Sequence, residues 1–238
     1  MSMLSSAEPS EGHIAASFDQ ALTELRLHVA AMGGLVIDQV SRAAHALLDD
    51  DISQADLVLG REDRVNELER NVDREAFRVI ALHQPMAVDL RITKAVSRVT
   101  VDLERAGDEA KKIARFAKHV AINAPHAPVI AVSSCLRRMS ALSVDMLRNA
   151  VRALDESDLE LANRVAARDL ELDAEFENAL RQILTVAMED RDVLRAIIDT
   201  VFVLKSFERI GDHAKNIAEQ AVFMVSGVDV RHRGKSRE

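Results

Sequence analysis

Apolar residues recur every three or four positions over long stretches of the chain. The run that begins near Phe18 places apolar side chains at Leu22, Leu25, Val29, Met32, Val36, Val40, Ala43 and Leu47. This spacing puts them on one face of a helix. Similar runs predict five further helices, near residues 52–83, 88–119, 129–155, 158–189 and 191–225. Because the connections between them are short, neighbouring helices are expected to be antiparallel, and the pattern predicts an all-α protein.

The interruptions of this pattern divide the chain. Asp49–Asp51 offers a cap for the helix that starts at Ile52, and Gln84–Pro85 ends that helix. The pair Gly33–Gly34, inside the first helix, indicates close helix packing or a bend. We therefore predict five segments: a flexible N-terminal tail (1–17), a first three-helix unit (18–123), a linker (124–128), a second three-helix unit (129–226) and a C-terminal tail (227–238).

The two predicted units are copies of each other. In the first two helices of each unit the best match comes at a shift of 107 residues, which pairs Asp38 with Asp145. In the last helix the shift is 104, and segment 104–114 matches segment 208–218 at eight of eleven positions. Internal repetition of this length indicates one supersecondary unit used twice. The sequence thus predicts two tandem three-helix bundles related by pseudo-twofold symmetry.

Composition excludes several classes of function. The formal net charge is −8 over 238 residues, which argues against a basic nucleic-acid footprint, and the absence of Trp and Tyr argues against base-stacking platforms. The single cysteine, Cys135, forms no internal disulfide and is expected to be a small buried residue. No targeting segment or membrane span is visible. We expect a soluble, cytoplasmic protein that reaches a membrane only through partners.

Acidic residues spaced four apart mark the repeated segments. Carboxylates at this spacing share one helix face, where their repulsion is unfavourable unless a cation lies between them. Each unit carries one such pair in its third helix and a second acidic or acid–amide pair in its middle helix. The four pairs are Glu62 with Asn66, Glu104 with Asp108, Asp169 with Asp173, and Glu208 with Asp212. Gly107 and Gly211 fall inside the third helices, where glycine is unfavourable unless another group approaches closely.

Antiparallel neighbours are expected to bring the two pairs of each unit together. The result is a patch of hard oxygen ligands suited to Mg²⁺, Mn²⁺, Fe³⁺ or Zn²⁺, and we predict metal binding there. The second unit is expected to bind a cation more tightly, since Asp173 is charged where Asn66 is neutral. Four basic residues beside the acids either neutralise them or attract an anion such as phosphate. They are Arg105, Lys111, Arg209 and Lys215.

An enzyme is not expected. Di-iron oxidases built on helical bundles use Glu-x-x-His pairs, and this chain has none. Glycine-rich loops that cradle phosphates are also absent. Isolated histidines such as His213 are expected to serve packing or the surface rather than to bind metal.

Several motifs resemble the PhoU family of bacterial proteins associated with phosphate transport. They are Met32–Val36, Gln84–Pro85 followed by Asp89–Arg91, Leu103–Asp108, Glu208–Asp212 and the ending Gly227–His232. The resemblance runs from about Phe18 to His232. It implies two three-helix bundles, often as a homodimer. It also implies a cytoplasmic negative regulator of phosphate uptake and of the phosphate-starvation response.

The partners that the resemblance implies are the ATPase subunit of the phosphate ABC transporter and a membrane sensor histidine kinase. Family members carry a Glu or Asp followed four residues later by Asp, and in some of them this motif binds iron, zinc or other metals. It maps here to Glu104/Asp108, Asp169/Asp173 and Glu208/Asp212. Glu62 matches the first position of a fourth copy, and Asn66 departs from it. Two alternatives stay open: an accessory protein of a different phosphate permease, and a metal-free helical adaptor.

Overall fold

A computed structural model describes residues 11–123, 127–189 and 192–230 of the chain. Within these residues all regular structure is helical, which confirms the predicted all-α class. The helices are α1 (Glu11–Leu48), α2 (Ile52–Leu59), α3 (Glu62–His83), α4 (Ala87–Asn123), α5 (Ala127–Ala131), α6 (Ser133–Glu156), α7 (Leu159–Glu189) and α8 (Leu194–Ser226). No helix in the described part of the chain is both long and apolar enough to span a membrane.

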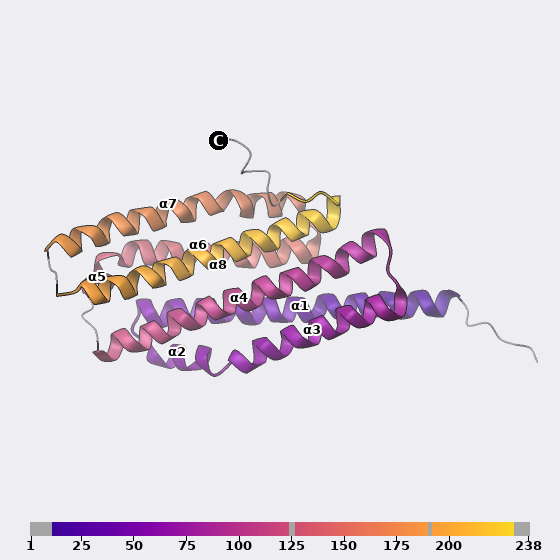
Figure 1. Ribbon diagram of the computed structural model, residues 1–238, viewed down its shortest axis with the longest axis horizontal. Helices are drawn as coiled ribbons and strands as arrows, with labels where there is room; N and C mark the ends of the chain where they lie inside the picture. Colours follow the sequence, from indigo (N-terminus) through magenta and orange to yellow (C-terminus); the bar gives the residue numbers. More distant parts are fainter. Residues whose placement is uncertain (1–10, 124–126, 190–191, 231–238) are drawn as a thin grey trace, which may run out of the picture.

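The helices form two three-helix units that lie side by side (Figure 1). In the first unit, α2 and α3 together form the middle leg between α1 and α4. In the second, α7 is the middle leg between α6 and α8. The units meet where α4 packs on α8 and α1 packs on α6. The predicted pair of tandem bundles is confirmed.

Contacts across the α4–α8 seam reveal the approximate twofold relation between the units. Asp102 of α4 contacts His213 of α8 at 3.0 Å, and Glu109 of α4 accepts a hydrogen bond from Ser206 of α8 at 2.8 Å. A shift of 104 residues carries position 102 to 206 and position 109 to 213. The two contacts therefore join equivalent pairs of positions, and the pseudo-twofold axis crosses the seam between them.

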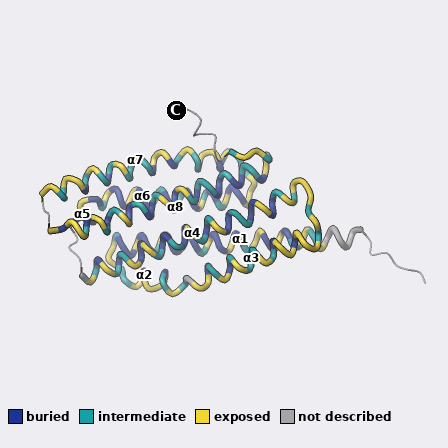
Figure 2. The backbone as a smooth tube through the Cα atoms, in the orientation of Figure 1, coloured by how far each residue is buried: buried dark blue, intermediate teal, exposed yellow. Residues whose placement is uncertain are grey.

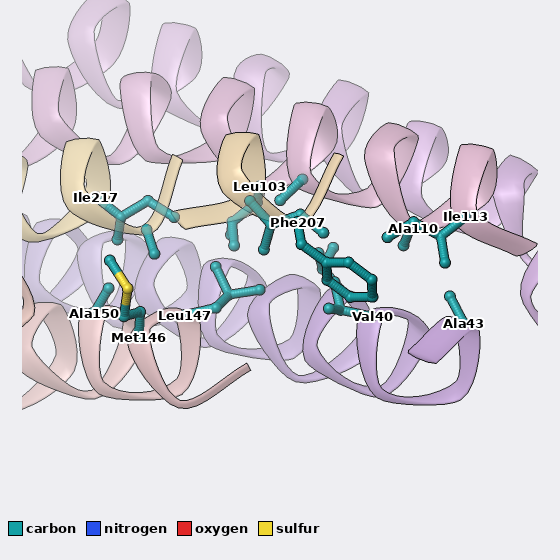
Figure 3. Packing of buried hydrophobic residues seen from close by; sticks show 14 of the residues in the cluster. Val40, Ala43, Leu103, Ala110, Ile113, Met146, Leu147, Ala150, Phe207 and Ile217 are labelled. Atoms are coloured by element: carbon teal, nitrogen blue, oxygen red, sulfur yellow. The ribbon is translucent and has the colours of Figure 1, made fainter. Parts of the chain in front are cut away.

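One hydrophobic core runs through both units. Each helix turns its buried face inward and its exposed face outward (Figure 2). Near the seam, Leu103 of α4 and Phe207 of α8 meet Val40 of α1 and Leu147 of α6 (Figure 3). All four are fully buried. Because burial of apolar surface contributes about 25 cal/mol per Å², this shared core fixes the two units against each other as well as folding each one.

One predicted boundary differs from the structure at the N-terminal side of each unit. Helix α1 begins at Glu11, so the predicted tail of residues 1–17 is too long; residues 1–10 lie outside the described part. Segment 11–17 contains Ala15 and Ala16, which favour a helix, and no proline stops it. Of the predicted linker 124–128, residues 124–126 are not described, and Ala127 and Pro128 belong to α5. Proline is tolerated there because N–H groups of a first helical turn have no partner within the helix.

The predicted helix near 52–83 is two helices. Asp51 caps α2 as expected, accepting a hydrogen bond from the backbone N–H of Ser53 at 3.0 Å. The helix then ends at Gly60, whose N–H bonds to the carbonyl of Asp56, while the N–H of Arg61 bonds to the carbonyl of Val58. Glycine loses more conformational entropy in a helix than other residues, so the break falls there. The end of α3 at His83, before Gln84 and Pro85, is as predicted.

Of the two adjacent glycines in α1, only Gly33 lies in close contact with a neighbouring helix. A Cβ atom on Gly33 would lie 2.9 Å from Cγ1 of Val151 in α6, whereas a Cβ on Gly34 would meet no atom within 4 Å. Close packing of α1 on α6 therefore accounts for Gly33. Helix α8 ends with Gly227 at φ +73°, a left-handed conformation that glycine adopts without strain.

Candidate functional site

The packing of α7 on α8 brings together the four predicted acids of the second unit. We call Asp169 and Asp173 of α7 with Glu208 and Asp212 of α8 the second acidic cluster. Burial raises the pKa of Asp173, and the nearby charges of Asp169 and Glu208 raise it further. The pKa of Asp212 is raised in the same way, by burial and then by Glu208 and Asp169. Four carboxylates are thus close enough to repel one another.

Two lysines are bound to this cluster. Lys215 donates a hydrogen bond to Asp169 at 2.5 Å, and Lys205 donates one to Glu208 at 2.5 Å. Burial alone would lower the pKa of Lys215, but the hydrogen bond to Asp169 and the nearby negative charges of Asp169, Glu219 and Asp212 together outweigh burial, and the pKa is raised. Lys215 is therefore a charge-balancing residue within the cluster.

One oxygen of the second acidic cluster has no partner. Glu208 is 12 % exposed, and its Oε2 atom is buried without a hydrogen bond. A buried carboxylate oxygen without a partner is unfavourable by about 1–3 kcal/mol. A cation or a water molecule beside it would relieve this penalty.

In the first unit, α3 and α4 bring Asn66 beside Glu104 and Asp108. Together with Lys111 they line a cavity of about 10 Å³. Burial raises the pKa of Glu104, and the charge of Asp108 adds to the shift. Lys111 lies 2.9 Å from Asp108. Glu62, the first residue of α3, has a side chain outside the described part of the structure.

The first unit has an acid that the sequence analysis missed, Glu69. Its pKa is raised by burial, then by the charge of Asp73 and more weakly by that of Asp108. It lies one helical turn after Asn66, on the same face of α3. Glu69 also stands four residues before Asp73, so the same spacing rule applied to all of α3 would have found it.

Gly107 and Gly211, the two glycines inside the repeated acidic segments, lie close to side chains of neighbouring helices, as predicted. A Cβ on Gly211 would lie 2.2 Å from Cδ2 of Leu172 in α7. A Cβ on Gly107 would lie 3.3 Å from Oε1 of Gln39 in α1. That oxygen is buried and has no hydrogen-bond partner. Glycine at these positions lets the neighbouring helices approach the backbone of the acidic segments.

The side-chain oxygens of the second acidic cluster, and those of Asn66, Glu104 and Asp108 in the first unit, are of the chemical type that hard cations prefer as ligands. They are carboxylate and amide oxygens, and the repulsion within the second acidic cluster and the unpartnered oxygen of Glu208 favour a positive charge there. In the described residues, no three Asp, Glu, His or Cys side chains are arranged to hold a metal ion. Lysine ammonium groups supply positive charge in this arrangement, so metal binding stays a prediction.

The predicted basic residues Arg105 and Arg209 lie at the α4–α8 seam. They occupy equivalent positions of the two units and line a groove of about 510 Å³ that also contains Asp108 and Asp212. Arg209 lies 3.3 Å from Glu109, the acid of α4 that is buried in the seam. These two arginines therefore face a surface shared by the two units rather than the centre of either cluster.

Glu109 is a further residue that the sequence analysis missed. It is 6 % exposed and accepts hydrogen bonds from Lys112 at 2.7 Å and Ser206 at 2.8 Å. Burial alone would raise its pKa, but these hydrogen bonds, the positive charge of Lys112 and a hydrogen bond from Arg209 together outweigh burial and lower the pKa. No spacing rule within one helix identifies Glu109, because Ser206 lies 97 residues away.

His213, expected to serve packing or the surface, joins the two units. It lies 3.0 Å from Asp102, which also accepts a hydrogen bond from Asn216 at 3.1 Å. This contact and the one at Glu109 flank the pseudo-twofold axis.

Comparison with known proteins gives a consistent result. The model of the PhoU domain family matches residues 29–117 and 136–221. The two matches begin 107 residues apart and end 104 apart, which are the two shifts of the internal repeat. The chain is 40 % identical over 225 residues to the phosphate-specific transport system accessory protein PhoU homolog of Pseudomonas aeruginosa, covering 94 % of this chain and 92 % of that protein. It is 35 % identical over 222 residues to the phosphate-specific transport system accessory protein PhoU of Escherichia coli, covering 93 % and 90 %.

Solved structures agree with this match. The crystal structure of PhoU from Pseudomonas aeruginosa superposes with a TM-score of 0.83 at 38 % identity, covering 89 % of this chain and all of that one. The phosphate transport system regulatory protein PhoU from Streptococcus pneumoniae superposes with a TM-score of 0.81 at 26 % identity, covering 90 % and 99 %.

Proposed function

Because the chain belongs to the PhoU family, we propose that it is a non-enzymatic accessory protein of a phosphate-specific transport system. The observation that carries the proposal is the match over more than nine tenths of the chain to proteins that bear this description. Coverage of both repeats supports a role of the whole two-unit body rather than of one unit.

The specific role that we propose is negative regulation in the cytoplasm. The protein would lower phosphate uptake and repress the phosphate-starvation response when phosphate is plentiful. It would do so by binding the ATPase subunit of the phosphate ABC transporter and a phosphate-sensing histidine kinase, and it would act as a homodimer. A protein without chemistry of its own regulates by binding its partners differently in two states. The two units share one core and leave their outer helix faces exposed, which suits such binding (Figure 2).

We also propose that the acidic clusters hold cations such as iron, zinc, manganese or magnesium. Asp169, Asp173, Glu208 and Asp212 are the proposed ligands in the second unit. Glu62, Asn66, Glu104 and Asp108 are the proposed ligands in the first. The mutual repulsion of the second acidic cluster supports this proposal.

A metal-free adaptor is a second candidate, and one observation favours it. Lys215 and Lys205 already donate to the second acidic cluster at 2.5 Å. In this alternative the lysines alone balance the acids, and the clusters serve as charged docking faces.

Complementation tests the regulatory role. The chain would be expressed in a bacterium that lacks its own PhoU-family gene and carries a reporter of the phosphate-starvation response. We expect the reporter to be repressed in phosphate-rich medium and induced on starvation. A reporter that stays fully induced in rich medium, with the protein present in the cell at the level of the native protein, would contradict the proposal. Phosphate uptake by strains that contain a single phosphate permease would show which transporter is served.

A further inference from the structure

A small cavity lies in the first unit, where α1, α3 and α4 pack against one another (Figure 1). Its volume is about 10 Å³, which is room for about one water-sized particle. The polar side chains that line it are Gln39 from α1, Asn66 from α3, and Glu104, Asp108 and Lys111 from α4. We call this cavity the amide pocket, after the two neutral amides in its wall.

Gln39 is buried at the amide pocket with an oxygen that has no partner. The residue is 3 % exposed, and its Oε1 atom accepts no hydrogen bond from the described residues, Lys111 included. Gly107 of α4 leaves room for this amide, since a Cβ there would lie 3.3 Å from Oε1. A buried amide oxygen without a partner is unfavourable. A species bound in the pocket would remove this penalty.

The second unit shows that core packing does not require an amide at this position. The shifts of the repeat carry Gln39 to Met146 and Gly107 to Gly211. Met146 is fully buried, and its Cε atom lies 3.6 Å from the place that a Cβ on Gly211 would take. The same slot therefore accepts an apolar side chain of similar length. The amide of Gln39 is better explained by what the pocket binds than by the packing of the core.

The charges around the pocket favour a cation over a water molecule. Burial raises the pKa of Glu104, and the negative charges of Asp108 and Glu69 raise it further. The positive charges of Lys111 and Arg105 oppose this shift, but each acts more weakly than either carboxylate. The two strongest charge effects on Glu104 are therefore repulsive. A neutral water molecule would satisfy the amide oxygen, whereas a cation would also relieve this repulsion.

The ligand chemistry of the amide pocket differs from that of the second acidic cluster. The pocket offers two neutral amides and two carboxylates, whereas the second acidic cluster offers four carboxylates. Amide and carboxylate oxygens together are typical ligands of Ca²⁺, and carbonyl, carboxylate and water oxygens also suit Mg²⁺. Zinc and iron favour imidazole or thiolate ligands, and no described His or Cys lines the pocket. The pocket therefore suits an alkaline-earth cation.

We propose that Gln39 is a ligand of a cation bound in the amide pocket, together with Asn66, Glu104 and Asp108, and that this pocket selects Ca²⁺ or Mg²⁺ over zinc and iron. The inference rests on the proposed function, in which the acidic clusters hold cations. It adds a ligand from α1. It also makes the two units different, because the second unit carries Met146 at the equivalent position and offers no such ligand.

Calorimetric titration of chelator-treated protein tests this inference, with CaCl₂, MgCl₂ and ZnCl₂ as separate probes. Gln39→Met places the side chain of the second unit in the first. Gln39→Glu keeps an oxygen ligand at the same place. The matched control is Met146→Leu, a volume-conserving change at the equivalent buried position of the second unit.

We expect Gln39→Met to weaken the binding of Ca²⁺ and Mg²⁺ at one site per chain by about tenfold or more, since the loss even of groups that only orient a metal ligand has an effect of this size. Zn²⁺ binding should be unchanged. Gln39→Glu should bind Ca²⁺ at least as tightly as the wild type, and Met146→Leu should match the wild type. Equal affinity of Gln39→Met and wild type for Ca²⁺ and Mg²⁺ would overturn the inference, as would an equal loss of Zn²⁺ binding.

Two further outcomes separate this inference from the proposed function. If the wild type binds cations and the alanine variant of the second acidic cluster loses all of them, the inference is overturned and the metal proposal for the second unit stands. If the wild type binds no cation, the inference and the metal proposal both fail. Complementation by the chain would still support its regulatory role in either case.

Thermal unfolding separates a cation ligand from a structural amide. In chelator, Gln39→Met should be at least as stable as the wild type, because the change removes a buried oxygen without a partner. Added Ca²⁺ or Mg²⁺ should raise the Tm of the wild type more than that of Gln39→Met, since a ligand that binds the folded protein stabilises it. A variant that is less stable in chelator and shows the same rise in Tm as the wild type would assign the amide to packing or to a bound water molecule, and would overturn the inference.

Discussion

Lys215 of α8 donates a hydrogen bond to Asp169 of α7 at 2.5 Å, which places an ammonium group among the carboxylates of the second acidic cluster. Asp169 is buried, and the ammonium group of Lys215 forms an ion pair with it. This contact shows how the fold accommodates several like charges in one place. It also means that a bound metal ion would have to compete with, or add to, a lysine.

Elemental analysis of untagged protein, purified without chelator, tests the metal proposal. We expect stoichiometric metal in the wild type and its loss in the variant that replaces Asp169, Asp173, Glu208 and Asp212 with alanine. The reason is that hard cations need several carboxylate oxygens. Absence of metal from the wild type would contradict the proposal and favour the adaptor alternative, in which lysines balance the acids.

Asp212→Asn should stabilise the metal-free protein at neutral pH. The substitution removes one of four mutually repelling charges, and we expect a gain of about 0.5 kcal/mol, kept small because the partly desolvated Asp212 side chain still contacts water, which screens its charge. A carboxyl whose pKa is raised on folding binds its proton more tightly in the folded chain. The ionised carboxylate of Asp212 therefore destabilises the folded protein, and this destabilisation grows as the pH rises from the ordinary pKa of the group to its raised value.

The measurement is thermal unfolding of wild type and Asp212→Asn in chelator, at pH 4 and at pH 7. The difference in Tm should be near zero at pH 4 and positive for the variant at pH 7. A variant that is less stable at pH 7 would show that the charge of Asp212 is favourable in the folded protein. A metal ion retained despite the chelator would have this effect, so the metal content of each sample is measured alongside.

Glu109→Gln should weaken the seam between the two units. The carboxylate accepts hydrogen bonds from Lys112, Ser206 and Arg209 in a buried position, so we expect a loss of about 2–3 kcal/mol in the free energy of unfolding. Urea unfolding at pH 7 measures it. Glu177→Gln, on the exposed surface of α7, is the control and should change stability little.

The pH dependence of this loss follows from the lowered pKa of Glu109. A carboxyl with a lowered pKa stabilises the fold above its ordinary pKa, and the stabilisation disappears as the pH falls through the lowered value. The difference between wild type and Glu109→Gln should therefore shrink on acidification below pH 4. A difference that is the same at pH 3 and pH 7 would show that the charge of Glu109 contributes nothing.

Gly211→Ala should destabilise the second unit. The added Cβ would lie 2.2 Å from Cδ2 of Leu172, a fully buried side chain that would have to move to another rotamer within the core. We expect a loss of about 1–3 kcal/mol from overpacking. Gly34→Ala is the matched control, because its Cβ would meet nothing within 4 Å and the change favours the helix by about 1 kcal/mol. Equal stability of the two variants would show that α7 does not pack against Gly211 as described.

Much of the candidate site follows from spacing within single helices. The pairs Glu104 with Asp108 and Glu208 with Asp212 were found because residues four apart share a helix face. Glu69 obeys the same rule, but its counterpart in the repeat is Phe176, so the pattern shared by the two units does not include it. Glu109 is different, since its partners Ser206 and Arg209 belong to the other unit.

Local sequence patterns were enough to predict most of the helices, their repetition and the all-α class. These depend on local information: the period of apolar residues, the positions of proline and the match between two segments of one chain. The break at Gly60 shows the limit of such information, because one glycine ends a helix only where packing does not oppose it.

How the two units meet and which charges pair depends on the packing of helices that are distant in sequence. The contacts of Asp102 with His213 and of Ser206 with Glu109 join residues about a hundred positions apart. The choice of Asp169 as the partner of Lys215 depends on the register of α8 against α7. The physical reason is that the helical repeat fixes the face of a helix on which a side chain lies, whereas the packing of the shared core fixes which neighbouring helix that face contacts.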